Sequence, residues 1–311
     1  MRRLAAGAVL LLLLTACSSV PKPATVRVRD AELARLDDGA RHAFERESSA
    51  QAVNLYAQVL RRARALDDAE EVGNAAYNLA VCLVAAGRYD AAEGFLREAA
   101  IELARARANV ADVLLVQARV AQLRGNAEAT LRFAGEVFTH PFSNPGPGHR
   151  AEVALLRGDI ACDRKQTDQA RALWSEARAL SRASPDATLV AGVERLGGRI
   201  LLVERRYEIA AQAFDREAVA RRDARQLHEL ARALGRAGEA WELAGKPLLA
   251  ADRYFRAARS GLAQGGRDSA RRWQQQAEQL AERAGDAQRA RQARALGAEI
   301  LPPEHAVAAE R

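Results

Sequence analysis

The chain has 311 residues, of which 28% are charged and only 5% are aromatic. This charge content excludes a membrane-embedded helix bundle, and the abundance of alanine, the best helix former, favours closely packed helices. Lysine and arginine number 47 against 40 aspartate and glutamate residues, a formal net charge of +7. Because the excess is spread along the whole length, it is only weak evidence for nucleic-acid binding and mainly favours solubility.

The first segment, residues 1–16, has the pattern of a secretory leader. Arg2 and Arg3 are basic, and the apolar run that follows, Leu4–Leu14, is shorter than the roughly twenty residues that cross a membrane. The sequence LTAC, which ends at Cys17, resembles the bacterial lipobox. In that motif small residues admit the peptidase, and the cysteine thiol takes a diacylglyceryl group. The alternative is a plain secretory leader with a chance cysteine.

The resemblance to lipoproteins implies an acylated N-terminus at Cys17, which anchors the chain to a membrane through more than one acyl chain. Ser18 follows, whereas inner-membrane lipoproteins commonly carry Asp there. We therefore expect an outer-membrane anchor with the body of the protein in the periplasm. Residues 17–30 contain two prolines and no helical period, which predicts a flexible tether.

Residues 31–300 repeat with a period close to 40. A small residue marks the first helix of each unit at Ala40, Ala80, Ala118, Gly158, Gly198 and Gly238, and Glu278 marks a weak seventh. A period of this size predicts seven stacked helical hairpins, because each hairpin buries its apolar faces only against its neighbours. Small residues allow two crossing helices to approach, and a glycine allows the chain to leave the helix.

The stretch Asn78–Ala99, NLAVCLVAAGRYDAAEGFLREA, resembles a tetratricopeptide repeat (TPR). Leu79-Ala80 stands for the Leu-Gly pair of that repeat, and Gly87 lies in its turn. The same turn position holds Gly125, Gly245 and Gly285 in other units, but Lys165 and Arg205 in two; the residues expected to open second helices are Tyr89, Tyr207 and Pro247. The resemblance implies an all-α fold, a right-handed α-solenoid of helix-turn-helix repeats. We expect the tail, 301–311, to be disordered.

The segment HPFSNPGPG, His140–Gly148, is the longest irregular piece predicted inside the body. It carries three prolines and two glycines, so we expect no helix there. It is either a presented loop with Phe142 at its tip or a simple connector. Both interpretations remain open from the sequence.

No constellation of residues indicates catalysis or a cofactor. The five histidines show no metal-ligand spacing, and no nucleophile, phosphate-loop or zinc-protease motif is present. Cys82 and Cys162 lie two hairpins apart, which favours two small buried residues over a disulfide. Asp159 and Asp163 share a helix face and could act as an acid–base pair, although such pairs are usually a solvated face.

In TPR arrays the first helices line a concave groove. Mapped by helical phase, the residues expected to face it are Tyr77, Val81, Val84, Leu115, Arg119, Gln122, Leu155, Asp159, Asp163, Arg195, Arg199, Leu202, Arg232, Glu239 and Glu242. This face begins apolar and continues with both signs of charge, whereas a polyanion needs one sign along its track. We expect its charges, Arg195 and Arg199 among them, to select a partner more than to hold the fold.

The sequence therefore predicts a non-enzymatic, lipid-anchored scaffold of the cell envelope that binds a protein or peptide partner in this groove, with envelope complex assembly as a candidate role. No nucleic acid, metal or cofactor is expected. The alternative is an envelope solute-binding protein or enzyme that uses the groove or the 140–148 loop. Such a protein would need a closed pocket with converging polar groups, which an open solenoid face offers poorly.

Overall fold

A computed structural model describes residues 29–46, 49–183 and 186–300 of the chain. Over these residues the chain forms fourteen α-helices and no strand. The expected leader (1–16), most of the expected tether (17–30) and the expected tail (301–311) lie outside the described residues, and so does Cys17. None of the described helices is both long enough and apolar enough to span a bilayer.

The helices pair in chain order into seven hairpins, in agreement with the repeat count predicted from the sequence. The first helices of the hairpins are α1 (Ala31–Glu45), α3 (Ala69–Ala85), α5 (Ala111–Leu123), α7 (Pro147–Asp163), α9 (Ala187–Val203), α11 (Leu227–Leu243) and α13 (Arg267–Arg283). The second helices are α2 (Ser49–Ala65), α4 (Tyr89–Arg105), α6 (Ala127–Thr139), α8 (Thr167–Ala183), α10 (Tyr207–Asp223), α12 (Pro247–Ala263) and α14 (Ala287–Ile300). Three second helices begin at the predicted residues, Tyr89, Tyr207 and Pro247.

The 40-residue period arises from the length of the helices. The seven consecutive helices α7 to α13 have 17 residues each, and links of three residues join them. Two helices and two links make up one period. The length beyond the usual repeat of about 34 residues therefore lies in longer helices and not in longer loops.

In the six hairpins from α3–α4 to α13–α14, whose turns are fully described, the turn uses a single left-handed residue. Gly87 and Gly245 have φ angles of 72° and 70°, as expected for glycine after a helix. Lys165 and Arg205 adopt the same conformation, with φ angles of 57° and 58°. The two units that lack glycine therefore keep the turn and accept the steric cost of a left-handed non-glycine residue.

The core is built from small residues facing large ones. A Cβ atom at Gly238 in α11 would lie 2.8 Å from the Tyr254 ring in α12, and one at Gly198 in α9 would lie 2.6 Å from the Phe214 ring in α10. Both pairs join the two helices of one hairpin, as the repeat pattern predicts. Gly158 is different, because its Cβ would lie 2.4 Å from Leu196, in the first helix of the next hairpin.

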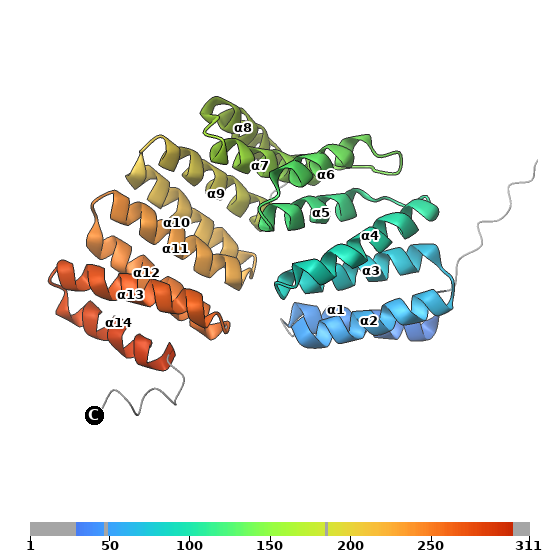
Figure 1. The fold of residues 1–311 in the computed structure, drawn as a ribbon, viewed down its shortest axis with the longest axis horizontal. Coiled ribbons are helices and arrows are strands. Elements are labelled where there is room, and N and C mark those ends of the chain that lie inside the picture. Colours follow the sequence, from blue (N-terminus) through green and yellow to red (C-terminus); the bar gives the residue numbers. More distant parts are fainter. Residues whose placement is uncertain (1–28, 47–48, 184–185, 301–311) are drawn as a thin grey trace, which may run out of the picture.

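The hairpins stack into an arch (Figure 1). In its middle, α5, α7 and α9 pack against one another in succession and lie on the inner side, while α6 and α8 lie on the outer side. First helices therefore line the concave face here, as they do in the repeat family that the sequence resembles.

The segment 140–148 is held against the body by specific hydrogen bonds. The Val110 amide donates to the Phe142 carbonyl at 3.1 Å, and the Asn144 amide donates to Asn109 Oδ1 at 2.9 Å. The prediction that all of this segment is irregular is wrong at its end, because α7 begins at Pro147. Proline is tolerated at the first helical position, since no donor is needed there. This tethering favours the connector interpretation over a freely presented loop.

Candidate binding face of the array

A cluster of charged and polar side chains connects the three inner helices α5, α7 and α9. We call it the inner cluster, and its members are Arg119, Gln122, Glu152, Asp159, Asp163, Arg195 and Arg199. They lie on the first helices of the third, fourth and fifth hairpins. The helices that carry the cluster lie on the inner side at the middle of the arch (Figure 1).

Asp159 is the centre of the inner cluster, and its side chain is only 1% exposed. Gln122 Nε2 donates to its Oδ2 at 2.9 Å from α5, and Arg199 Nη1 donates to its Oδ1 at 2.8 Å from α9. Arg195 Nη2 lies 2.7 Å from Oδ2 in an ion pair whose angles are not those of a hydrogen bond. One carboxylate therefore holds three helices together.

Reciprocal glycine contacts bring α7 and α9 close enough to bury this carboxylate. A Cβ atom at Gly158 would lie 2.4 Å from Leu196, and one at Gly192 would lie 2.5 Å from Leu155. The glycine of each helix thus leaves room for a leucine of the other helix to pack against it. Asp159 follows Gly158 in the sequence, so the close approach removes its side chain from solvent.

The outer members of the cluster remain partly accessible. Arg119 bridges the Gln122 amide oxygen at 2.9 Å and the Glu152 carboxylate at 2.7 Å. Arg199 also pairs with Asp163, whose side chain is 68% exposed. The heads of Arg119 and Arg199 are therefore fixed by several partners while part of each side chain stays accessible to solvent.

The ionisation of the cluster follows from these contacts. Burial disfavours the charged form of Asp159, but Arg195, Arg199 and the Gln122 amide outweigh it and lower its pKa below the ordinary value. Burial likewise opposes the charge of Arg195, but Asp159 and Glu217 raise the pKa of the guanidinium. The carboxylate and both guanidinium groups are therefore charged at neutral pH.

A second buried charge lies beside the inner cluster, at the junction of α9, α10 and α11. Glu217 is fully buried and accepts from Arg236 Nη2 at 2.7 Å and from Arg236 Nε at 3.2 Å. Arg221, one turn further along α10, donates to Glu217 and to Gln226, which in turn donates to Thr188 Oγ1 of α9 at 3.1 Å. Burial lowers the pKa of Arg221 despite the attraction of Glu217 and Glu229.

Several residues that the helical phase assigns to the groove surface have a different environment in the structure. Leu155 and Asp159 are buried, so a partner chain cannot touch either of them. The expectation that Arg195 and Arg199 do little for the fold is wrong, because both neutralise a buried carboxylate. The interpretation of Asp159 and Asp163 as a solvated pair is wrong for Asp159 for the same reason.

The other predicted residues have solvent access. Asp163, Arg232 and Glu239 are exposed. Glu242 is half-buried and accepts from the Tyr254 hydroxyl at 3.3 Å. The remaining half-buried positions are Tyr77, Val81, Val84, Leu115, Arg119, Gln122, Arg195, Arg199 and Leu202.

Sequence reasoning missed the second buried charge. Glu217 and Arg221 lie four residues apart on α10, a spacing that is common on exposed helix faces and gives no sign of burial. Their partners Arg236 and Gln226 lie on or just before α11. The one available signal was Glu217 itself, which stands in the repeat position that holds Ala177 and Ala257 in the fourth and sixth units.

The described residues offer no group of three or more histidine, cysteine or acidic side chains that could hold a metal ion. Cys82 and Cys162 are free and buried, as predicted, and burial raises the pKa of each thiol to about 11. Neither thiol is therefore a ready nucleophile at neutral pH.

Comparison with solved structures finds the same kind of fold. A Rap protein complexed with competence and sporulation factor shares 12% identity with this chain over 87% of this chain and 77% of its own, with a TM-score of 0.59. The apo form of RapI shares 10% identity over 86% of this chain and 76% of its own, with a TM-score of 0.52. A tetratricopeptide repeat protein from Parabacteroides merdae covers 85% of this chain and 99% of its own at 13% identity, with a TM-score of 0.46.

At these identities the likeness concerns the fold alone, a tetratricopeptide-like helical solenoid. No model of a protein family matches the sequence, and no curated protein matches it either.

Proposed function

We propose that this solenoid is a scaffold that binds an extended segment of a partner protein along its concave face, across the inner cluster and the exposed charges of α11. The observation that carries the proposal is the inner cluster itself. Its arginine heads are held in place before a partner arrives, so binding does not have to order them. Fixed donors and carboxylates of both signs favour a partner segment of mixed charge.

The similar Rap protein supports this proposal by analogy, since its structure is a complex with competence and sporulation factor. The open form of the face also favours a chain over a small molecule, because small ligands are usually enclosed in a concave pocket. We therefore favour a binding role without catalysis.

Photo-crosslinking on opposite faces tests the proposal. A benzophenone side chain at Arg232 or Glu239, on the inner-cluster side of α11, should crosslink a partner in cells. The same group at Arg97 of α4 or Arg182 of α8, both exposed on second helices, serves as the control. Adducts only from the control positions would refute binding on the concave face.

The proposal extends to the location of the protein. We propose that Cys17 is acylated and holds the body at the periplasmic side of the outer membrane, on the strength of the leader pattern and the LTAC sequence. Cys17→Ser should give a protein that folds but is no longer anchored by lipid. Membrane fractionation with mass analysis of the N-terminus tests this, and a membrane-bound, unacylated variant would contradict it.

A further inference from the structure

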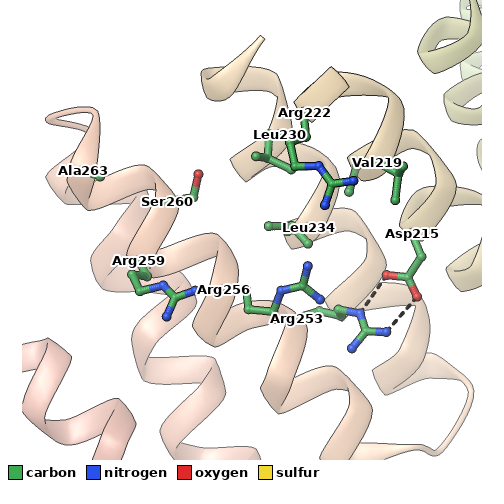
Figure 2. A pocket seen from close by; sticks show the side chains of 11 residues that line it. Asp215, Val219, Arg222, Leu230, Leu234, Arg253, Arg256, Arg259, Ser260 and Ala263 are labelled. Atoms are coloured by element: carbon green, nitrogen blue, oxygen red, sulfur yellow. Dashed lines mark hydrogen bonds and ion pairs between the residues drawn. The ribbon is translucent and has the colours of Figure 1, made fainter. Parts of the chain in front are cut away.

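A hollow lies between α10, α11 and α12, on the faces of α10 and α11 that are turned away from the buried Glu217. We call it the outer groove; it measures about 470 Å³, and α10 and α12 form its walls with α11 as its floor. On α11, Leu230 and Leu234 face the outer groove, while Arg236 faces Glu217. The outer groove is therefore a surface separate from the concave face. Figure 2 shows it from close by.

The apolar lining of the outer groove is partly open to solvent. Leu230 and Leu234 rise from α11 and Ala218 and Val219 come from α10, but Leu234 and Ala218 are each only 4% exposed. Val219 is 48% exposed, so part of its apolar side chain faces water, which is less favourable than burial. A ligand with apolar side chains would remove this surface from water.

The one acidic residue that lines the outer groove is already neutralised. Arg253 Nε donates to Asp215 Oδ1 at 2.7 Å, and Arg253 Nη2 donates to Oδ2 at 3.1 Å. Trp241 Nε1 donates to Oδ2 as well, at 3.1 Å. Asp215 therefore does not repel an approaching carboxylate.

The other three charged residues around the outer groove are arginines with weak partners. Within the described part of the chain, Arg222 forms an ion pair only with its neighbour Asp223, at 3.4 Å, and Arg256 lies 3.6 Å from Asp252. Among the described residues Arg259 has no carboxylate within ion-pair distance, and it lies over the Phe255 ring at 5.9 Å. In Figure 2, Arg222 and Arg256 reach in from opposite walls on either side of Leu234. The rim is thus positive and the floor apolar.

We propose that the outer groove binds an acidic, leucine-bearing helical segment of a partner protein. Carboxylates of such a segment pair with Arg222, Arg256 and Arg259, whose planar heads suit carboxylates, while its leucines cover Leu230 and Val219. A nucleic acid has the charge but no apolar side chains for the floor. This binding is independent of the concave face and gives the scaffold a second attachment point.

Fluorescence anisotropy with a synthetic probe tests the proposal. The probe is a fluorescein-labelled peptide of glutamates with leucines at helical three- and four-residue spacing, and its counterpart carries glutamine in place of every glutamate. The full-length protein should bind the first peptide and not the second. Combining Arg222→Gln, Arg256→Gln and Arg259→Gln should weaken binding at least about tenfold.

A matched variant controls for net charge. Arg61→Gln, Arg97→Gln and Arg182→Gln remove three exposed arginines from other second helices and should leave binding within about twofold. Arg259→Gln alone, which breaks no ion pair, should weaken binding and keep the melting temperature, so a folding defect cannot explain the loss. The concave-face pair Arg232→Glu and Glu239→Lys should leave probe binding unchanged.

Two results would overturn the proposal. Equal weakening by both triple variants would show that the probe senses net charge and not the outer groove. Binding of phosphatidylglycerol vesicles through the three arginines, without binding of the peptide, would assign the surface to a membrane instead.

Discussion

The middle of the array and its C-terminal part use the same repeat with different chemistry. Between α5 and α9 the first helices contact one another, and the inner cluster joins them around Asp159. From α11 to α14 each helix packs mainly on the next in the chain, and glycine–aromatic contacts such as Gly238 with Tyr254 set the spacing. Packing forces do not depend on pH, whereas ion pairs do. The two regions should therefore respond differently to charge changes and to changes of volume.

The largest effect should come from removing the buried carboxylate. Asp159→Asn takes from Arg195 its paired carboxylate, leaves Arg199 with only the exposed Asp163, and should cost about 3–5 kcal/mol, as breaking a buried ion pair does. Urea unfolding measures it. Asp163→Asn, which changes an exposed partner of the same Arg199, should cost less than about 1 kcal/mol. Equal costs would mean that the carboxylate does not hold the middle together.

Adding side-chain volume at a helix crossing should destabilise the C-terminal part. Gly238→Leu forces a side chain into the Tyr254 ring and should cost about 1–3 kcal/mol or more. Gly94→Leu, in α4 where no atom lies within 4 Å of an added Cβ, is the matched control and should cost little or even stabilise. Thermal melts compare them. Similar losses would contradict the proposed register of the repeat.

Acid should weaken the middle before the C-terminal part. The pKa of Asp159 is lowered in the folded state. Its contribution to the free energy of unfolding is therefore fully present above the pKa of the unfolded chain, about 4, and is lost as the pH falls through the folded pKa. Glu229, whose pKa is also lowered, acts in the same direction at α11. The protection of α7 and α9 amides against hydrogen exchange, measured relative to the intrinsic exchange rates at each pH, should fall on acidification before that of α12 and α13. Simultaneous loss of protection in all four helices would argue against a local stabilisation of the middle by the ion pairs of Asp159.

The smallest effect concerns the turns. Lys165→Gly relieves a left-handed non-glycine residue and should stabilise the protein by up to about 1 kcal/mol, since the strain released exceeds the entropy lost. Gly245→Ala, at a turn with φ of 70°, should lose a similar amount. Melting temperatures report both changes. Destabilisation by Lys165→Gly would mean that the lysine side chain has a role in the turn.

The helix boundaries, the turns and the repeat period could be predicted from the sequence. The period places small residues at helix crossings, and the turn glycines and Tyr89, Tyr207 and Pro247 show where second helices begin. The link between α10 and α11 gives no such signal, because its left-handed residue is Arg225 and arginine does not mark a turn. The fold is robust to such gaps, since neighbouring units fix the register.

The burial of charge could not be predicted in this way. Asp159 and Asp163 are both aspartates on one helix, and helical phase assigns both to the inner side. Only the approach of α9, set by Gly158 and Gly192, decides that one is buried and the other exposed. The deciding contacts come from residues more than thirty positions away, which a local pattern does not report.

The uniform three-residue links of the C-terminal part have a consequence for how the array can grow. Links inside hairpins and links between them share one geometry, with left-handed residues at Arg205, Arg225, Gly245 and Gly265. A block that starts at any helix and contains two helices with their two links can therefore be duplicated or removed without a new kind of junction. We expect in-frame gain or loss of such a block to preserve the inner and outer alternation of the helices. A single-helix insertion would exchange the two faces of every hairpin that follows.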